Sequence, residues 1–154
     1  QDSSDLSVQT VPAQISAVDT IYDLVILKSD LRLEADVNIV GADAAPVGTM
    51  ISTFGFPHAD HGRLVLTRQD TEVGARVLIS SSGIKAKHLI LNIQARPGQS
   101  GSPIFHKSTG GLVGVLTGSY APRGGSGISL GGVDPYTLHQ TTHAISAEYL
   151  RRMY

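Results

Sequence analysis

The feature that most constrains the fold of this chain is a series of short runs rich in β-branched residues, separated by turn residues. The runs are SVQTV, AQISAV, DLVILK, VGTMISTFGF, RLVLTR, RVLISS, HLILNI, GLVGVLTG and SGISLGG. Segments rich in Gly, Pro, Asp and Ser lie between them, such as PHADHG, SSSG and STGG. Short strands at regular spacing are typical of an all-β sandwich or barrel and not of βαβ units. The 17 glycines suit tight turns and barrel corners.

The C-terminal segment HAISAEYLRRMY is the exception to this pattern. Its apolar residues recur near helical spacing: Ala144, Ile145, Tyr149, Leu150 and Met153. Ser146 is suited to an N-cap, and Arg151 and Arg152 lie near the end, where cations favour the helix dipole. We therefore predict one short C-terminal helix packed on a β body.

Composition excludes several classes of protein. With 41% apolar and 16% charged residues in 154, the chain is long and apolar enough to fold around a core. A net charge of −1 with dispersed Lys and Arg argues against a nucleic-acid partner, and no run approaches the ~18 apolar residues of a membrane span. The absence of cysteine excludes disulfides and a thiolate nucleophile, and is compatible with any compartment. Because the chain begins at Gln1, we expect that it begins at a processing, cleavage or engineered boundary.

The stretch RPGQSGSPIF, residues 96–105, concentrates turn residues around one serine. Gly98 and Gly101 flank Ser100, so the backbone on both sides can take positive φ or approach another group closely. One interpretation is a hairpin or β-arch connection, which needs no chemistry. The other is a nucleophile on a strained turn, with the N–H groups of Gly98 and Ser100 forming an anion site.

The segment AVDTIYDLVILKSD, residues 17–30, carries a carboxylate at the start of an apolar strand. A buried carboxylate is costly unless it is hydrogen-bonded. Asp23 is therefore either a strand-initial residue that faces solvent or an aspartate that orients a histidine.

Together these segments resemble the chymotrypsin-like (trypsin-like) serine proteases, and more closely the disulfide-free bacterial branch that includes HtrA and glutamyl-endopeptidase-like enzymes. DLVILK resembles that family's Asp-Leu-Ala-x-Leu-Lys strand, and VGTMISTFGFP its apolar strand ending in Gly-x-Pro. GQSGSP resembles Gly-Asn-Ser-Gly-Gly-Pro, GGLVGVLTG the following Gly-x-x-Gly-Val strand, and THAISAEYL the terminal segment. The matches occur in the family's order over most of the chain.

The resemblance implies an all-β double six-stranded β-barrel of chymotrypsin type, with the first barrel incomplete in this chain and a short C-terminal helix. Residues 1–40 are then a remnant of the N-terminal barrel, and residues 41–154 the C-terminal barrel with the terminal helix.

The resemblance also implies roles for individual residues. Ser100 becomes the nucleophile, Asp23 the partner of the catalytic histidine, and the Gly98 and Ser100 N–H groups the oxyanion hole. Gln99 stands where digestive enzymes carry an aspartate that pairs with a freed N-terminus, so an activation switch of that kind is not expected. Ser102 replaces a glycine, which is tolerated if its φ is negative. No metal or organic cofactor is implied.

The resemblance further places the substrate side chain against a set of pocket residues: Gln94, Ala95, Thr117, Gly118, Ser119 and His143. Gln94 is neutral, which does not support a strongly basic preference. Thr117, Ser119 and His143 favour a polar or acidic side chain, whereas Ala95 leaves room for a modest apolar one.

The catalytic histidine is not found in this chain. In the resembled family it precedes the aspartate, yet none of the 22 residues before Asp23 is histidine. The six histidines lie later: His58, His61, His88, His106, His139 and His143. We interpret PHADHG, with His58, Asp60 and His61, as a polar surface turn, with a His-x-Asp-His metal cluster as the weaker alternative. His88 and His106 are expected to face solvent.

Three explanations for the missing histidine remain open. The histidine lies on an N-terminal segment that is a separate chain or was lost, the protein is a degenerate protease that only binds peptide, or one of the six histidines has taken the role. An incomplete barrel leaves an exposed strand edge and an uncovered apolar face, which favours the first explanation. We therefore predict a serine endopeptidase acting on a peptide or protein. The alternatives are a catalytically inactive protease-like module that binds peptide by β-augmentation, and a β-barrel binding protein unrelated to proteases.

Overall fold

The computed structural model describes residues 10–32, 36–81, 83–120 and 141–154. The strands are β1 (Ala13–Asp19), β2 (Leu24–Ser29), β3 (Met50–Gly55), β4 (Thr67–Ser81), β5 (Ile84–Leu91), β6 (Pro103–His106), β7 (Leu112–Tyr120) and β8 (Thr141–Ser146). Three 3₁₀ turns join them: η1 (Ala42–Ala44), η2 (Ala59–His61) and η3 (Ala147–Arg152). Within these ranges, no helix is long and apolar enough to cross a membrane.

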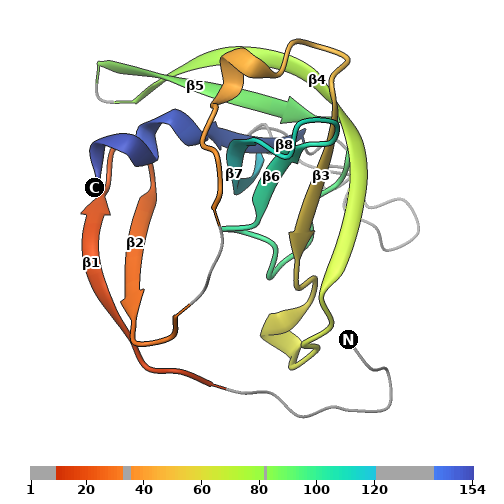
Figure 1. Ribbon diagram of the computed structural model, residues 1–154. Coiled ribbons are helices and arrows are strands. Elements are labelled where there is room, and N and C mark those ends of the chain that lie inside the picture. The colour runs from red at the N-terminus through yellow and green to blue at the C-terminus, as the bar shows by residue number, and fades with distance from the viewer. Residues whose placement is uncertain (1–9, 33–35, 82, 121–140) are drawn as a thin grey trace, which may run out of the picture.

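Strands β3 to β8 form a closed barrel in the order β3-β4-β5-β8-β7-β6 (Figure 1). Neighbouring strands are antiparallel. Within the barrel, closure pairs each strand on both sides, which removes free edges there. The predicted all-β fold is confirmed, with one complete six-stranded barrel and a second, incomplete sheet.

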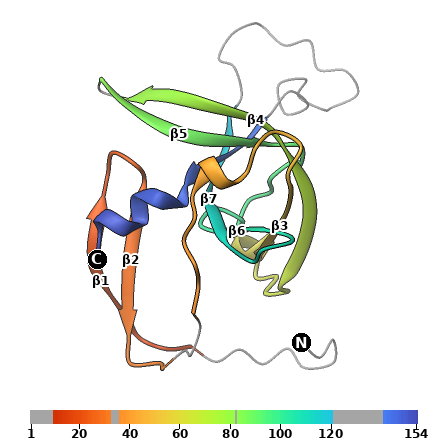
Figure 2. The ribbon, with the colours of Figure 1, turned by 45° about the horizontal axis from the view of Figure 1, so that its top comes forward.

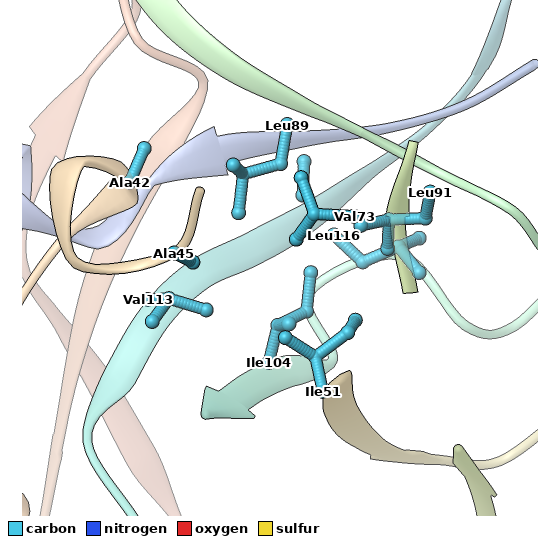
Figure 3. Packing of buried hydrophobic residues seen from close by; sticks show 10 residues of the cluster. Ala42, Ala45, Ile51, Val73, Leu89, Leu91, Ile104, Val113 and Leu116 are labelled. Carbon is cyan, nitrogen blue, oxygen red and sulfur yellow. The ribbon is translucent and has the colours of Figure 1, made fainter. Parts of the chain in front are cut away.

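The barrel interior is filled by aliphatic side chains from all six strands and from η1, as Figure 3 shows. Successive residues of a strand point to opposite faces. On β5, Leu89 and Leu91 therefore point into this core, while His88 and Ile90 lie on the outer face of the barrel.

Strand β4 is longer than the sequence indicates. RLVLTR and RVLISS predict two strands, but residues 63–66 are irregular and 67–81 form one 15-residue strand. A register shift between Val73 and Ala75 bends this strand. Gly74 lies at the shift, where a Cβ would come within 2.2 Å of the Asn92 side chain. Beyond the barrel, the end of β4 pairs with residues 84–87 of β5 as a projecting hairpin (Figure 1).

Strands β1 and β2 form a separate two-stranded antiparallel sheet beside the barrel (Figures 1 and 2). Ile15 is opposite Leu27, and Val18 is opposite Val25. These four side chains are exposed, Ile15 by 67% and Leu27 by 60%. The sheet thus has the uncovered apolar face that was expected of an incomplete first barrel.

The C-terminal turn η3 joins the small sheet to the barrel. Tyr149 stacks on Tyr22 with 4.0 Å between ring centroids, and its hydroxyl accepts a hydrogen bond from the Lys87 N–H. The Lys87 ammonium contacts Asp43 and Glu148, and these hydrogen bonds, chiefly that with Asp43, raise the pKa of Lys87.

The helix prediction is correct in position but wrong in detail. The turn is 3₁₀ and begins at Ala147, whereas Ala144 and Ile145 belong to β8. Ser146 occupies the N-cap position without capping the turn. Its hydroxyl instead accepts a hydrogen bond from the Ala42 N–H at 2.8 Å, 104 residues away in sequence, which explains why a local capping argument failed.

Replacing Leu89 tests the core. Leu89 is fully buried, so Leu89→Ala is expected to lower the free energy of unfolding by about 2–5 kcal/mol through lost burial and a residual cavity. Leu78 on the projecting hairpin is 63% exposed, so Leu78→Ala is expected to change the free energy of unfolding by less than about 0.5 kcal/mol. Urea denaturation of both variants measures the difference, and equal effects would contradict the assigned core.

Candidate active site

The backbone around Ser100 has the special conformation that the sequence indicated. Gly98 has φ +86° and Gly101 has φ +84°, whereas Ser102 is not among the residues with positive φ. A Cβ on Gly98 would lie 2.6 Å from the Phe56 carbonyl oxygen and 2.8 Å from the Ala59 nitrogen. Gly98 is therefore required both for its φ and for the close approach of the turn that contains η2.

Backbone hydrogen bonds in this loop leave two N–H groups unused. Gln99 N donates to Arg96 O at 3.1 Å, and Gly101 N donates to Leu116 O at 2.7 Å. Ser102 N donates to Gln99 O at 3.0 Å. In the part of the chain that the structure describes, the N–H groups of Gly98 and Ser100 donate no hydrogen bond. Peptide N–H groups exposed in a turn can stabilise a negative charge.

The Ser100 side chain lies exposed against strand β7. Its hydroxyl donates a 3.3 Å hydrogen bond to the Thr117 carbonyl oxygen. Among the described residues, no imidazole nitrogen lies within hydrogen-bonding distance of this hydroxyl. None of the described histidines therefore activates Ser100 in this conformation.

Asp23 lies in the turn of the β1–β2 hairpin, with φ 54°, and its side chain is exposed. The turn is held by Asp19, whose carboxylate accepts hydrogen bonds from the N–H groups of Ile21 and Tyr22 at 3.0 and 3.1 Å. Within residues 10–32, 36–81, 83–120 and 141–154, the Asp23 carboxylate accepts no hydrogen bond. Because the Asp23 side chain is exposed, its carboxylate does not incur the desolvation cost of a buried carboxylate.

Strand β7 connects the surroundings of Asp23 with those of Ser100. Leu24, adjacent to Asp23, is buried in a cluster with Ile145, and Val115 of β7 packs against that cluster. Ser100 bonds to Thr117, two residues further along β7, which is about 7 Å in an extended strand. Strand β7 therefore supplies one residue that packs against the Leu24 cluster and another that hydrogen-bonds to Ser100.

The structure brings the predicted pocket segments together through β8. Ala95 N donates to the hydroxyl of the fully buried Thr142 at 2.8 Å. The Thr117 hydroxyl donates to His143 O at 3.2 Å. Gly118 pairs with His143, and Ser119 pairs with Thr142. Gln94 is exposed next to Ala95.

His88 and His143 form a ring pair on the outer face of the barrel, which corrects the expectation that His88 faces solvent. Their centroids are 6.4 Å apart, and both rings are half-buried. Burial lowers the pKa of both imidazoles, and the proximity of His143 lowers the pKa of His88 further. The His143 ring also hydrogen-bonds to the Thr141 hydroxyl at 2.8 Å.

The other described histidines form no hydrogen bond with Ser100. His58 and His61 flank and end η2, with ring centroids 6.5 Å apart, and the His58 N–H donates to Pro97 O at 2.7 Å. His106 contacts Ser108. His139 lies outside the described residues. Within the described chain, no group of three or more His, Cys, Asp or Glu side chains could hold a metal ion.

Two polar residues at the site were not singled out from the sequence. The Thr142 hydroxyl of β8 accepts a hydrogen bond from the Ala95 N–H in the predicted pocket. The Gln69 side chain of β4 accepts a hydrogen bond from the buried Gln99 side chain. Gln69 lies in the polar stretch QDTE, which contains no signal that separates it from an ordinary surface glutamine.

Comparison with known proteins places this chain in a family. Residues 2–115 match the family model of the trypsin-like peptidase domain, a range that contains both Asp23 and Ser100. The chain belongs to this family of trypsin-like peptidase domains. A comparison with curated protein sequences gave no match.

Several solved structures share this fold at low sequence identity. The HtrA-type protease AlgW, solved with a decapeptide, is 20% identical with a TM-score of 0.66, and the match covers 93% of this chain and 39% of that one. The MamO protease domain from Magnetospirillum magneticum is 18% identical with a TM-score of 0.62, over 94% of this chain and 68% of that one. The inactive form of Rv3671c from M. tuberculosis H37Rv is 16% identical with a TM-score of 0.63, over 93% and 63%. At these identities the likeness defines the fold alone, and this chain spans less than half of AlgW.

Alanine substitution of the two loop glycines tests the close approach at Gly98. Gly98→Ala combines positive φ with a backbone clash and is expected to lower the free energy of unfolding by about 3 kcal/mol or more. Gly101 has nearly the same φ, but no atom lies within 4 Å of the position that a Cβ would take there, so Gly101→Ala is expected to cost about 1 kcal/mol. Chemical denaturation measures both, and a Gly98→Ala variant as stable as Gly101→Ala would refute the packing of this loop against η2.

The histidine pair predicts how stability depends on pH. Because burial lowers the pKa of His88 and His143, the unfolded chain binds more protons below its ordinary histidine pKa of about 6.5. The free energy of unfolding is therefore expected to fall as pH decreases from about 7.5 to about 5.5. Asp70, whose pKa is held well below its usual range chiefly by a hydrogen bond from Arg68, loses its contribution only at more acidic pH.

The matched variant for this prediction is His88→Gln, which cannot be protonated. Its loss of stability between the two pH values is expected to be smaller than that of the original protein. An unchanged or larger loss, measured by urea denaturation at each pH, would show that the buried ring is not the group that titrates.

Proposed function

We propose that this protein is a serine endopeptidase in which Ser100 is the nucleophile. The Ser100 Oγ attacks the carbonyl carbon of the scissile peptide bond while a histidine accepts the hydroxyl proton. The carbonyl oxygen becomes an oxyanion bound by the N–H groups of Gly98 and Ser100. The C–N bond then breaks as the histidine protonates the amine, and water hydrolyses the resulting ester.

The observation that carries this proposal is the hydrogen-bonding pattern of the loop. The N–H groups of Gln99, Gly101 and Ser102 are used within the loop or by β7. Those of Gly98 and Ser100 are unused among the described residues, and they lie on either side of Gln99, next to an exposed hydroxyl. Both residues are exposed, so these two N–H groups remain accessible to the oxyanion of a substrate.

The histidine in this mechanism is supplied by a segment outside these 154 residues. The apolar outer face of β1 and β2 offers a surface on which such a segment completes the first barrel. Asp23 lies at the end of that sheet, next to the anchor at Leu24. There its carboxylate orients the incoming imidazole and stabilises its protonated form.

Substrate binding is assigned to the segments gathered by β8. We place the substrate side chain between Gln94 and Ala95 on one side and Thr117, Gly118 and Ser119 on the other, with His143 at the wall. AlgW, which shares the fold, was solved with a decapeptide and with a tripeptide, and a peptide substrate is proposed for this chain by that analogy.

A second candidate function is a peptide-binding module without catalysis. It is favoured by the absence, among the described residues, of an imidazole at the Ser100 hydroxyl. An unactivated serine hydroxyl is a poor nucleophile, so the protein would then display peptide along β7 by β-augmentation.

Labelling with a fluorophosphonate probe distinguishes the two functions. In the natural, uncut protein, the probe is expected to label Ser100, since it reacts only with an activated serine, and Ser100→Ala is expected to abolish labelling. Intact mass and peptide mapping measure the modified residue.

Ser108→Ala is the matched control, because the exposed Ser108 hydroxyl lies 3.2 Å from the His106 Nδ1 atom. That variant is expected to label normally. Labelling that is lost in Ser108→Ala and kept in Ser100→Ala would show that Ser100 is not the nucleophile. No labelling of the complete protein would favour the binding module.

A further inference from the structure

The loop that carries Ser100 is built around a buried neutral side chain. Gln99 is only 1% exposed. Its Oε1 atom accepts a 2.7 Å hydrogen bond from the Arg96 N–H, and its own N–H donates to the Arg96 carbonyl at 3.1 Å. The side chain and main chain of one residue thus close the same turn, which spans Gly98.

The second half of the Gln99 amide depends on another element. Its Nε2 atom donates a 2.7 Å hydrogen bond to the Oε1 atom of Gln69 on β4, 30 residues away. Gln69 is half-buried and pairs across the sheet with Thr53 of β3. A buried amide donor without an acceptor is costly, so Gln69 is what allows Gln99 to remain in this buried position.

We infer that Gln69 is a positioning residue for the proposed oxyanion hole. By accepting from Gln99, Gln69 holds the turn in the conformation that leaves the Gly98 and Ser100 N–H groups unused. This inference rests on the proposed function of Ser100. Gln69 touches neither the substrate nor the reacting atoms, and acts through Gln99.

The hydrogen bond between Gln69 and Gln99 differs from an ion pair. Both side chains are uncharged amides, so no protonation step or freed amino group is required to form their hydrogen bond. The loop conformation is therefore maintained by β4 of the barrel itself and does not change with pH through ionisation of this pair.

The test compares three variants of Gln69 in the complete, active protein. Gln69→Met keeps a similar length without a strong acceptor, Gln69→Asn keeps the amide but shortens its reach, and Gln69→Glu retains an acceptor oxygen. Gln69→Met and Gln69→Asn are expected to lower kcat for a peptide substrate by about 10- to 100-fold, because the oxyanion donors are misplaced. In Gln69→Met and Gln69→Asn, KM is expected to change by less than about threefold. Gln69→Glu is expected to keep kcat within about threefold of the original value.

A peptide aldehyde supplies a readout that a merely structural role would not move. The adduct that the aldehyde forms with Ser100 carries the oxyanion. The affinity of Gln69→Met for the aldehyde is therefore expected to fall about as much as kcat, while the KM of the matching substrate stays nearly constant. Thr53→Val is the control: it removes a neighbouring buried hydroxyl that has no partner among the described residues, and both quantities are expected to remain unchanged.

Urea denaturation of each variant identifies the folded ones, and Gln69→Asn carries the test if Gln69→Met does not fold. Folded Gln69 variants with unchanged kcat and aldehyde affinity would overturn the positioning role while leaving Ser100 as the nucleophile. A complete protein that Ser100-directed probes do not label would overturn the proposed function, and this inference with it.

Discussion

Two reciprocal backbone hydrogen bonds fix the arrangement on which the candidate site depends. Gly101 N donates to Leu116 O at 2.7 Å, and Leu116 N donates to Ser102 O at 2.9 Å. Leu116 is itself fully buried in the barrel core. The turn around Ser100 is therefore attached to the barrel core, and the Ser100 hydroxyl reaches Thr117 because that residue is the next one along β7.

The alternation of side chains along the barrel strands assigns different tasks to their two faces. Leu89 and Ala144 fill the interior, whereas His88, His143 and Ile145 lie on the outer face. That outer face receives Leu24 from the small sheet and adjoins the predicted pocket. The core and the predicted pocket thus share strands β7 and β8, so packing inside the barrel determines the spacing of groups outside it.

Sequence reasoning predicted those parts of the fold that have local signals. Runs of β-branched residues predicted an all-β chain, and the glycines beside Ser100 predicted the positive φ values that the structure has. Strand β6 was missed because it has only four residues, and β8 because the spacing of Ala144 and Ile145 was assigned to the C-terminal helix. A different reason explains Ser146 and Gln69: each bonds to a partner far away in sequence, and nothing in the neighbouring residues indicates that partner. The assignments of Ser100, Asp23 and the pocket residues came from the family resemblance and remain proposals.

The small sheet has a thermodynamic consequence for Asp23. A two-stranded hairpin is only marginally stable on its own, and β1 and β2 are anchored through Leu24 and the stacking of Tyr22 on Tyr149. The opposite face, with Ile15 and Leu27, gains apolar burial only when another segment covers it. Association of a segment with this face and ordering of the hairpin would consequently be linked equilibria, so covering the face would also order the turn that carries Asp23.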